Sequence, residues 1–336
     1  MSDGVVKRRA IPAMAAGVAV VLIMIWSFDP RKVLTVIART EPRLFALAVC
    51  IQLVDLLLWA LRWHLVLVRG GVKAPFRLVF AVNNVSMLVN NITPSARSGG
   101  EPLRVYLLAR MTRYRARDIA SSVVIDRVLD YFPLTLLLLL SAFLIAGSGG
   151  RGGILVILLG GVSFLTAALI LSLWFLASER YVHRVARGVL RLLSRVSRRV
   201  RARRLWEELD EWVERFVKQL RELLQDRLTL IQGTLLSAAV WGCEILRTYV
   251  VFLSLGREVP LPVIVVSFTV SMFAGVLPLL PGGLGLVEIS TASVYRLWGI
   301  DPGTSAAVAL LDRLISYWMV NAIGVISLLR ISRRER

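Results

Sequence analysis

Apolar residues form several segments that are long enough to cross a membrane, separated by short polar or basic stretches. An α-helix rises about 1.5 Å per residue, so about 20 apolar residues span the hydrocarbon core of a bilayer. Two further apolar segments, 76–92 and 261–280, end in helix-breaking proline and glycine and are not expected to cross completely. Six segments predict full transmembrane helices: 11–28, 44–68, 119–146, 154–177, 228–255 and 305–329.

Basic residues between these segments indicate their orientation, because short cytoplasmic loops are rich in lysine and arginine. Residues 7–9 are basic and precede a first segment without a convincing small-residue cleavage site, which predicts an uncleaved anchor with a cytoplasmic N-terminus. A complete crossing by 76–92 would place the basic stretch 110–117 outside. We therefore expect 76–110 to form a re-entrant hairpin that enters from the cytoplasm. The basic tail 330–336 predicts a cytoplasmic C-terminus.

A motif occurs twice, as PSARSGGE at 94–101 and as PGGLGLVE at 281–288. Each copy has a glycine-bearing turn that opens with proline and ends in a glutamate, and an Asp-Arg pair follows. The glutamate and the aspartate are 25 residues apart in the first copy and 24 in the second. The pairs are Asp126-Arg127 and Asp312-Arg313. This spacing indicates an internal duplication.

The duplication and the orientation together predict an all-α polytopic membrane protein with an inverted repeat. Repeat 1 covers 44–146 with its hairpin at 76–110. Repeat 2 covers 228–329 with a hairpin at 261–298 that opens to the outside. The prediction is a single membrane domain with six full spans and two re-entrant hairpins, and a plasma-membrane location.

Composition agrees with a membrane setting, since 57% of the residues are hydrophobic. The net charge of +19 is compatible with nucleic acid, but the arginines flank apolar spans and no nucleic-acid-binding motif is visible. Anionic membrane lipid is the partner that we expect. Cys50 and Cys243 lie in apolar spans, which argues against a disulfide framework or a cysteine metal site. No cofactor is predicted.

A basic segment at 179–227 separates the two repeats. Between 180 and 198 arginines recur at helical spacing, with apolar residues on other faces. This pattern is typical of a cytoplasmic amphipathic helix on anionic lipid, and a mixed-charge helix follows it. A simple topology determinant without a recognition role is the alternative.

The first hairpin offers the chemistry of a phosphate site. A turn at the start of a short helix exposes backbone N–H groups to an anion. Arg97 and Arg104 are placed to hold a phosphate, and Glu101 to orient them or to change its protonation. A network that only neutralises itself is the alternative. Asn91, Ser98, Gly99 and Gly100 complete this part of the predicted substrate site.

Other charged residues fall inside the predicted spans. Asp126 and Asp130 share one helical face, and with Arg127 we expect them to line the substrate site. The second copy offers Gly283, Glu288, Asp312 and Arg313 but no arginine in its turn, so the first hairpin is the better phosphate candidate. Helix-to-helix pairing is the role that we expect for the remaining charges: Asp55, Arg62, Glu244 and Arg247.

The stretches NNITPSARSGGEPLRVYLLAR, SSVVIDRVLD, and PGGLGLVE followed by LLDR resemble the flippase-like membrane domain of lysylphosphatidylglycerol synthases and their stand-alone bacterial and archaeal relatives. The resemblance covers about 10–330. It implies an eight-helix-like domain that moves lipids or lipid-linked headgroups between leaflets. The soluble aminoacyl-transferase domain of the synthases is not expected here, so lysine transfer is not implied.

The predicted function is therefore the flipping of an anionic phospholipid or polyprenyl-phosphate lipid by alternating access. His64 and His183 are the only histidines, and no zinc cluster, nucleophile elbow or catalytic triad is visible, so we expect no enzyme activity. A lipid-phosphate transferase that uses Glu101 or Asp126 as a base is the first alternative. A membrane scaffold is the second.

Overall fold

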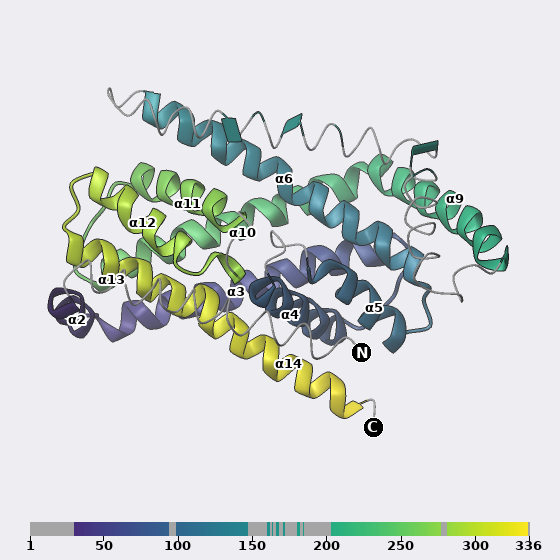
Figure 1. The fold of residues 1–336 in the computed structure, drawn as a ribbon, viewed down its shortest axis with the longest axis horizontal. Helices are drawn as coiled ribbons and strands as arrows, with labels where there is room; N and C mark the ends of the chain where they lie inside the picture. The colour runs from purple at the N-terminus through teal and green to yellow at the C-terminus, as the bar shows by residue number, and fades with distance from the viewer. Residues whose placement is uncertain are drawn as a thin grey trace.

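The computed structural model describes residues 30–93, 99–146, 203–276 and 281–334, together with scattered residues between 160 and 184. Every regular element within these ranges is helical (Figure 1). The expected anchor at 11–28 and the turn residues Arg97 and Ser98 lie outside the described residues. Most of the expected span at 154–177 and of the expected amphipathic helix at 180–198 also lies outside them. The elements are α2 (Pro30–Ala38), α3 (Pro42–Arg69), α4 (Phe76–Ile92), α5 (Glu101–Met111), α6 (Ala116–Ala146), α9 (Arg203–Gln225), α10 (Arg227–Ser254), α11 (Leu261–Val276), η2 (Pro281–Gly283), α12 (Leu286–Leu297), α13 (Pro302–Arg313), η3 (Leu314–Met319) and α14 (Val320–Arg334).

Three of the described helices are long and apolar enough to cross a membrane. They are α3, α10 and the continuous helix Pro302–Arg333, which is made of α13, η3 and α14 and contains a π-helical turn at η3. These helices coincide with the predicted spans 44–68, 228–255 and 305–329. The predicted span 119–146 falls within α6, a helix of 31 residues.

The helices α3 and α10 form the central pair of the fold. Arg62 and Gln52 of α3 contact Ser237 and Arg247 of α10, respectively. Residue numbers rise along one helix as they fall along the other, so the two helices are antiparallel. Other elements pack around this pair, with α4 against α14 and α11 against α6.

Two pairs of short helices flank the centre, α4 with α5 and α11 with α12. Figure 1 places α4 and α5 in the half of the molecule near α9 and the C-terminus, and α11 and α12 in the opposite half. With 11 residues α5 is about 16 Å long, and with 12 residues α12 is about 18 Å long. Neither helix is long enough to cross a bilayer.

The first pair is held at close range by a glycine. A Cβ atom on Gly100 would overlap the carbonyl oxygen of Ser86 in α4, so only glycine fits between the helices. The backbone N–H of Gly100 donates to Asn90 Oδ1 at 2.6 Å. These contacts set the start of α5, where Glu101 is the first residue.

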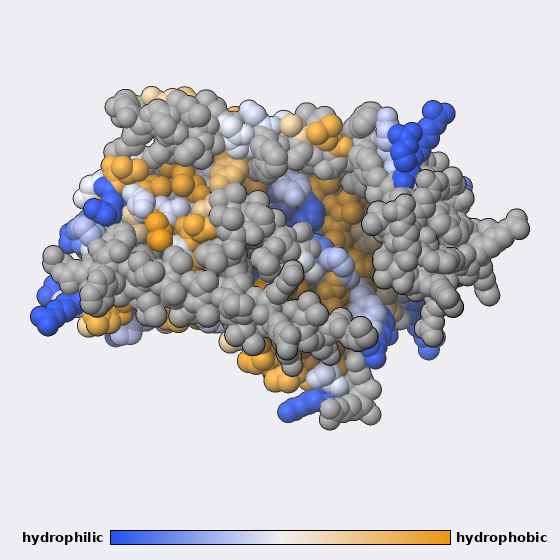
Figure 2. Space-filling model, viewed as in Figure 1, coloured by the Kyte–Doolittle hydropathy of each residue, from blue (hydrophilic) through white to orange (hydrophobic). Residues whose placement is uncertain are grey.

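Charged side chains are buried beside an apolar core, while many large apolar side chains lie on the surface, which is unusual for a water-soluble protein. Large apolar side chains are exposed along the outer faces of the long helices, such as Leu57 on α3, Phe143 on α6 and Leu235 on α10. Charged side chains such as Asp126 are fully buried. Figure 2 shows hydrophobic surface along the body of the molecule and strongly hydrophilic residues toward its ends. The protein is thus membrane-embedded, with its outer apolar side chains facing lipid.

The helix α9 packs on the membrane helices through its apolar face. Val213, Phe216 and Val217 lie in one cluster with Val66 of α3 and Ile125 of α6. Gln219 donates to the carbonyl oxygen of Gly70 at 2.8 Å, which fixes α9 beside the loop between α3 and α4.

Candidate functional site

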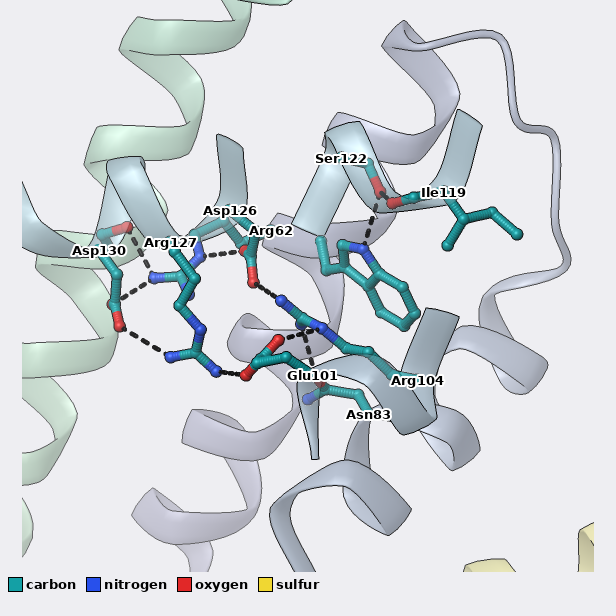
Figure 3. A network of polar contacts seen from close by, with 11 residues as sticks. Arg62, Asn83, Glu101, Arg104, Ile119, Ser122, Asp126, Arg127 and Asp130 are labelled. Carbon is teal, nitrogen blue, oxygen red and sulfur yellow. Dashed lines mark hydrogen bonds and ion pairs between the residues drawn. The ribbon is translucent and has the colours of Figure 1, made fainter. Parts of the chain in front are cut away.

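Six charged side chains from three helices meet in one buried network, here called the first cluster (Figure 3). Three are arginines and three are carboxylates, so their formal charges cancel. Most of the ion pairs join different helices. The members are Arg62 on α3, Glu101 and Arg104 on α5, and Asp126, Arg127 and Asp130 on α6.

Arg62 and Asp126 form the centre of the first cluster, and both side chains are fully buried. Arg62 Nε donates to Asp126 Oδ1 at 2.7 Å, and Arg62 Nη1 donates to Asp130 Oδ1 at 2.6 Å. The second carboxylate oxygen of Asp126 accepts from Arg104 Nη2 at 3.0 Å. One aspartate therefore joins α3, α5 and α6.

Glu101 is shared by two arginines at the start of α5. Its Oε2 lies 2.7 Å from Arg104 Nε, and its Oε1 accepts from Arg127. The Arg104 side chain is 1% exposed, whereas those of Glu101 and Arg127 are 15% and 26% exposed. The Glu101–Arg127 side of the network is thus its more exposed side.

Two tryptophans of α3 cover the arginines. The guanidinium of Arg104 lies 4.7 Å from the ring centre of Trp63, and that of Arg62 lies 4.8 Å from Trp59. Cation–π contacts of this kind are stronger when the cation is desolvated. Together with the ion pairs, these contacts hold the guanidinium planes in place.

A second network, here called the second cluster, surrounds Arg247 on α10. It comprises Arg247 and three carboxylates, which are Glu244 on α10, Asp312 on α13 and, through Gln52, Asp55 on α3. Arg247 Nε donates to Asp312 Oδ1 at 2.9 Å, and Arg247 Nη2 lies 2.7 Å from Glu244 Oε2.

Gln52 connects α3 and α10 within the second cluster. Its Oε1 accepts from Arg247, and its Nε2 donates to Asp55 Oδ2 at 2.9 Å. With one arginine and three carboxylates, the second cluster carries more acid than base.

Glu288 and Arg313 form a separate pair beneath the second turn. Glu288 Oε1 accepts from Arg313 Nε at 2.8 Å, and its Oε2 accepts from the backbone N–H of Gly285 at 2.7 Å. Arg313 also donates to the carbonyl oxygen of Gly282. Both oxygens of Glu288 are therefore occupied, one by Arg313 of α13 and the other by the backbone of the turn.

The second turn, at η2, packs against the C-terminal end of α4. Asn91 at the end of α4 donates through Nδ2 to Asn321 Oδ1 at 2.8 Å, and its carbonyl oxygen accepts from the hydroxyl of Tyr317 at 3.2 Å. Gly283 adopts φ 67°, a left-handed conformation that glycine tolerates best. The two halves of the molecule meet here.

The sequence-based site residues fall into three groups. Glu101, Arg104, Asp126, Arg127 and Asp130 come together in the first cluster. Glu288 and Arg313 form the separate pair, and Asp312 belongs to the second cluster. Gly99 and Gly100 lie beside the start of α5, and Asn91 and Gly283 lie where the second turn meets α4.

Sequence reasoning assigned Arg62 and Arg247 to helix-to-helix pairing, and each does pair with a carboxylate of another helix. It did not consider Trp59, Trp63, Gln52 or Ser237. A signal was available for the arginines. Arg62 precedes its partner Asp126 by 64 residues, and Arg247 precedes Asp312 by 65. The duplicated spacing extends to these pairs.

Comparison with known proteins identifies the family to which the chain belongs. The model of the lysylphosphatidylglycerol synthase TM region matches residues 14–324. The chain belongs to this family. Proteins similar to this chain include a UPF0104 membrane protein from Methanothermobacter thermautotrophicus. It is 30% identical, over 95% of this chain and 94% of the relative. A UPF0104 membrane protein from Pyrococcus horikoshii is 28% identical over 94% of this chain and 95% of the relative. The match is consistent with a stand-alone member of the UPF0104 type.

Another relative corrects the expectation that the protein has no enzyme activity. The chain is 27% identical to a protein named glycosyltransferase AglD from Haloferax volcanii, over 97% of this chain and 55% of the relative. The absence of a recognisable catalytic motif does not exclude catalysis here, because motif-based exclusion covers only chemistries with a known local signature. The expectation of a non-enzyme was wrong on this evidence.

Proposed function

We propose that this membrane protein moves an anionic phospholipid or a lipid-linked phosphate across the bilayer by alternating access, with the first cluster as the phosphate site. The carrying observation is that two guanidinium groups, those of Arg104 and Arg127, share the single carboxylate of Glu101 at the more exposed side of a buried network. We place the protein in the plasma membrane with both termini in the cytoplasm.

Contacts between α3 and α10 support an inverted repeat. Arg62 and Arg247 are 185 residues apart, and so are Gln52 and Ser237. Arg62 contacts Ser237, and Arg247 contacts Gln52. Exchange of equivalent residues across an antiparallel pair is what a two-fold axis in the membrane plane produces.

The short helices support a site near the middle of the membrane. The pairs α4–α5 and α11–α12 occupy opposite halves of the molecule, and α5 and α12 are about half as long as a crossing helix (Figure 1). Turns between such helices end near the bilayer centre when the pairs are re-entrant. Transporters of this plan rock one repeat against the other around a midplane site.

The exchange of Glu101 for a phosphate is the proposed binding step. Arginine binds phosphate through parallel charge-assisted hydrogen bonds. A phosphate that displaces the Glu101 carboxylate meets the guanidinium groups of Arg104 and Arg127 together, while Asp126 keeps Arg104 in place. The Glu101 carboxylate thus competes with the lipid phosphate, and it pairs with the two arginines again when the lipid leaves.

An enzyme that acts on a lipid-linked phosphate is the second candidate function. The relative named glycosyltransferase AglD favours it. The same arginines would hold the phosphate in both cases. The two functions differ in whether the lipid is chemically changed.

Purified protein in liposomes tests the proposal. Labelled anionic phospholipid and polyprenyl phosphate are followed for transfer between leaflets, and the recovered lipids are analysed by mass spectrometry. Arg104→Gln and Arg127→Gln should each slow transfer at least tenfold, because a charge-assisted hydrogen bond to phosphate contributes about 1.5–3 kcal/mol. The exposed Arg110 on the same helix supplies the matched control, since Arg110→Gln leaves the first cluster intact. Transfer at the wild-type rate in both variants would place the phosphate site elsewhere, and modified lipid would favour the enzyme.

Glu101→Gln separates binding from release. Without its negative charge the side chain competes poorly for the two arginines, so bound anionic lipid should be held more tightly. Transfer should nevertheless become slower, because release is impaired. Titration of lipid binding by native mass spectrometry, run beside the transfer assay, measures both effects. Weaker lipid binding in this variant would contradict the displacement step.

A further inference from the structure

The second cluster has more carboxylates than arginines, and one of these carboxylates lies at the middle of a membrane helix. Asp55 is 13 residues from the start of α3 and 14 from its end, and it is 2% exposed. Its Oδ2 accepts from Gln52, but within the described part of the chain its Oδ1 has no hydrogen-bond partner. A buried carboxylate oxygen without a donor is costly if the group is ionised, and a bound proton removes this cost.

The groups that face Asp55 do not supply the missing positive charge. They are Cys243, Glu244 and Arg247 on α10 and Asp130 on α6. Arg247 is already bound to Asp312 and Glu244. Of the other elements packed on α3, α4 carries only Arg77, near its start, and η3 carries no charged residue.

Equivalent positions around Arg62 show that the excess acid is specific to the second cluster. The 185-residue offset that relates Arg62 to Arg247 relates Asp55 to Val240, and it relates Trp59 to Glu244. The first cluster thus has an apolar and an aromatic residue where the second cluster has two carboxylates. The duplicated framework carries a neutral network in one copy and an acid-rich network in the other.

We infer that the second cluster is a proton site, with Asp55 as the group that takes up and releases the proton. This deepens the proposed function and rests on it for the link to transport, since a proton bound in one repeat can drive a lipid phosphate bound in the other. Asp55 receives the proton from water on one side of the membrane and returns it to water on the other. Among the described residues no group of three or more His, Cys, Asp or Glu side chains is arranged to hold a metal ion.

Infrared spectroscopy of the purified protein in lipid tests the proton site without any transport. Wild-type protein at neutral pH should show the C=O stretch of a protonated carboxylic acid, and the band should disappear as pH rises. Asp55→Asn should remove the band. Glu258→Gln, which changes an exposed acid in the loop after α10, should leave it unchanged.

A second variant keeps the test informative if Asp55→Asn does not fold. Glu244→Gln removes one neighbouring negative charge, so the band should titrate away at lower pH than in the wild type. A band that is absent from the wild type, that persists in Asp55→Asn, or that does not move in Glu244→Gln would overturn the proton site.

The link to transport is tested in liposomes with a pH gradient. Wild-type transfer should respond to the gradient, and transfer by Asp55→Asn should not, while its lipid binding is retained. A wild type that moves no lipid in either condition, yet shows the titrating band, would refute the proposed function and leave the proton site standing. A wild type that moves lipid equally with and without the gradient would refute the coupling alone.

Discussion

Replacement of Asp126 by asparagine is expected to destabilise the first cluster strongly. The carboxylate is fully buried and accepts from Arg62 and Arg104 through different oxygens. Asparagine keeps the size of the side chain but removes its charge. The cluster then holds three arginines and two carboxylates, so one positive charge is left uncompensated in the membrane.

The expected loss of stability is large. Breaking a buried ion pair by removing one partner costs about 3–5 kcal/mol, because the remaining charge stays desolvated. Asp126 pairs with two arginines, so the cost should lie at the upper end of that range. Arg62 retains Asp130 as a partner, which keeps the loss from doubling.

The equivalent change in the second copy, Asp312→Asn, provides the matched comparison. Arg247 keeps Glu244 as a partner, and the acid-rich second cluster loses one of its three carboxylates. Reduced repulsion among carboxylates offsets part of the lost ion pair, so we expect a cost of no more than about 2 kcal/mol.

Equilibrium unfolding in mixed detergent micelles, followed by circular dichroism, measures both free energies. Asp126→Asn should destabilise the protein more than Asp312→Asn. The double variant Asp126→Asn/Arg104→Gln restores charge balance. Its loss of unfolding free energy should be smaller than the sum of the losses in the two single variants. An equal or larger loss in Asp312→Asn would refute the charge count on which both clusters are interpreted.

Two further predictions concern the helix pairs. Gly100→Ala should lower the stability of the protein by about 1–3 kcal/mol or prevent its folding, because the new methyl overlaps the Ser86 carbonyl. Gly242→Ala, at an open position within α10, should be neutral or stabilising, and thermal unfolding of both variants measures the difference. Single cysteines at Ser95 and Leu286 in a cysteine-free background should react with a membrane-impermeant maleimide from opposite sides of the membrane, and same-side labelling would contradict the inverted repeat.

Much of the fold could be predicted from apolar segment length and helix-breaking residues. The helices α3, α10 and Pro302–Arg333 lie where hydrophobic runs of sufficient length predicted them. The short helix α5 begins at Glu101, directly after the glycine pair, as the breaking residues indicated. The π-helical turn at η3 was not predictable, because its sequence is an ordinary apolar run that equally fits an α-helix.

The residues of the candidate site could be predicted from the sequence, but the partners that they contact could not. The duplicated motif identified Glu101, Asp126 and Arg127, which do meet in one network. It could not show that Glu288 is bound to the turn before it, because that contact depends on how the backbone N–H of Gly285 is oriented. The difference in charge balance between the two clusters required the packing of α3 on α10, which no local pattern encodes.

The most direct test of the phosphate site is an experimental structure of the protein in lipid nanodiscs that contain anionic phospholipid or polyprenyl phosphate, with the bound lipid identified by mass spectrometry. We expect a lipid phosphate within hydrogen-bond distance of the Arg127 and Arg104 guanidinium groups, with the Glu101 carboxylate displaced from at least one of them. An intact Glu101 network with the lipid phosphate bound elsewhere in the protein would contradict the proposed function at its central point.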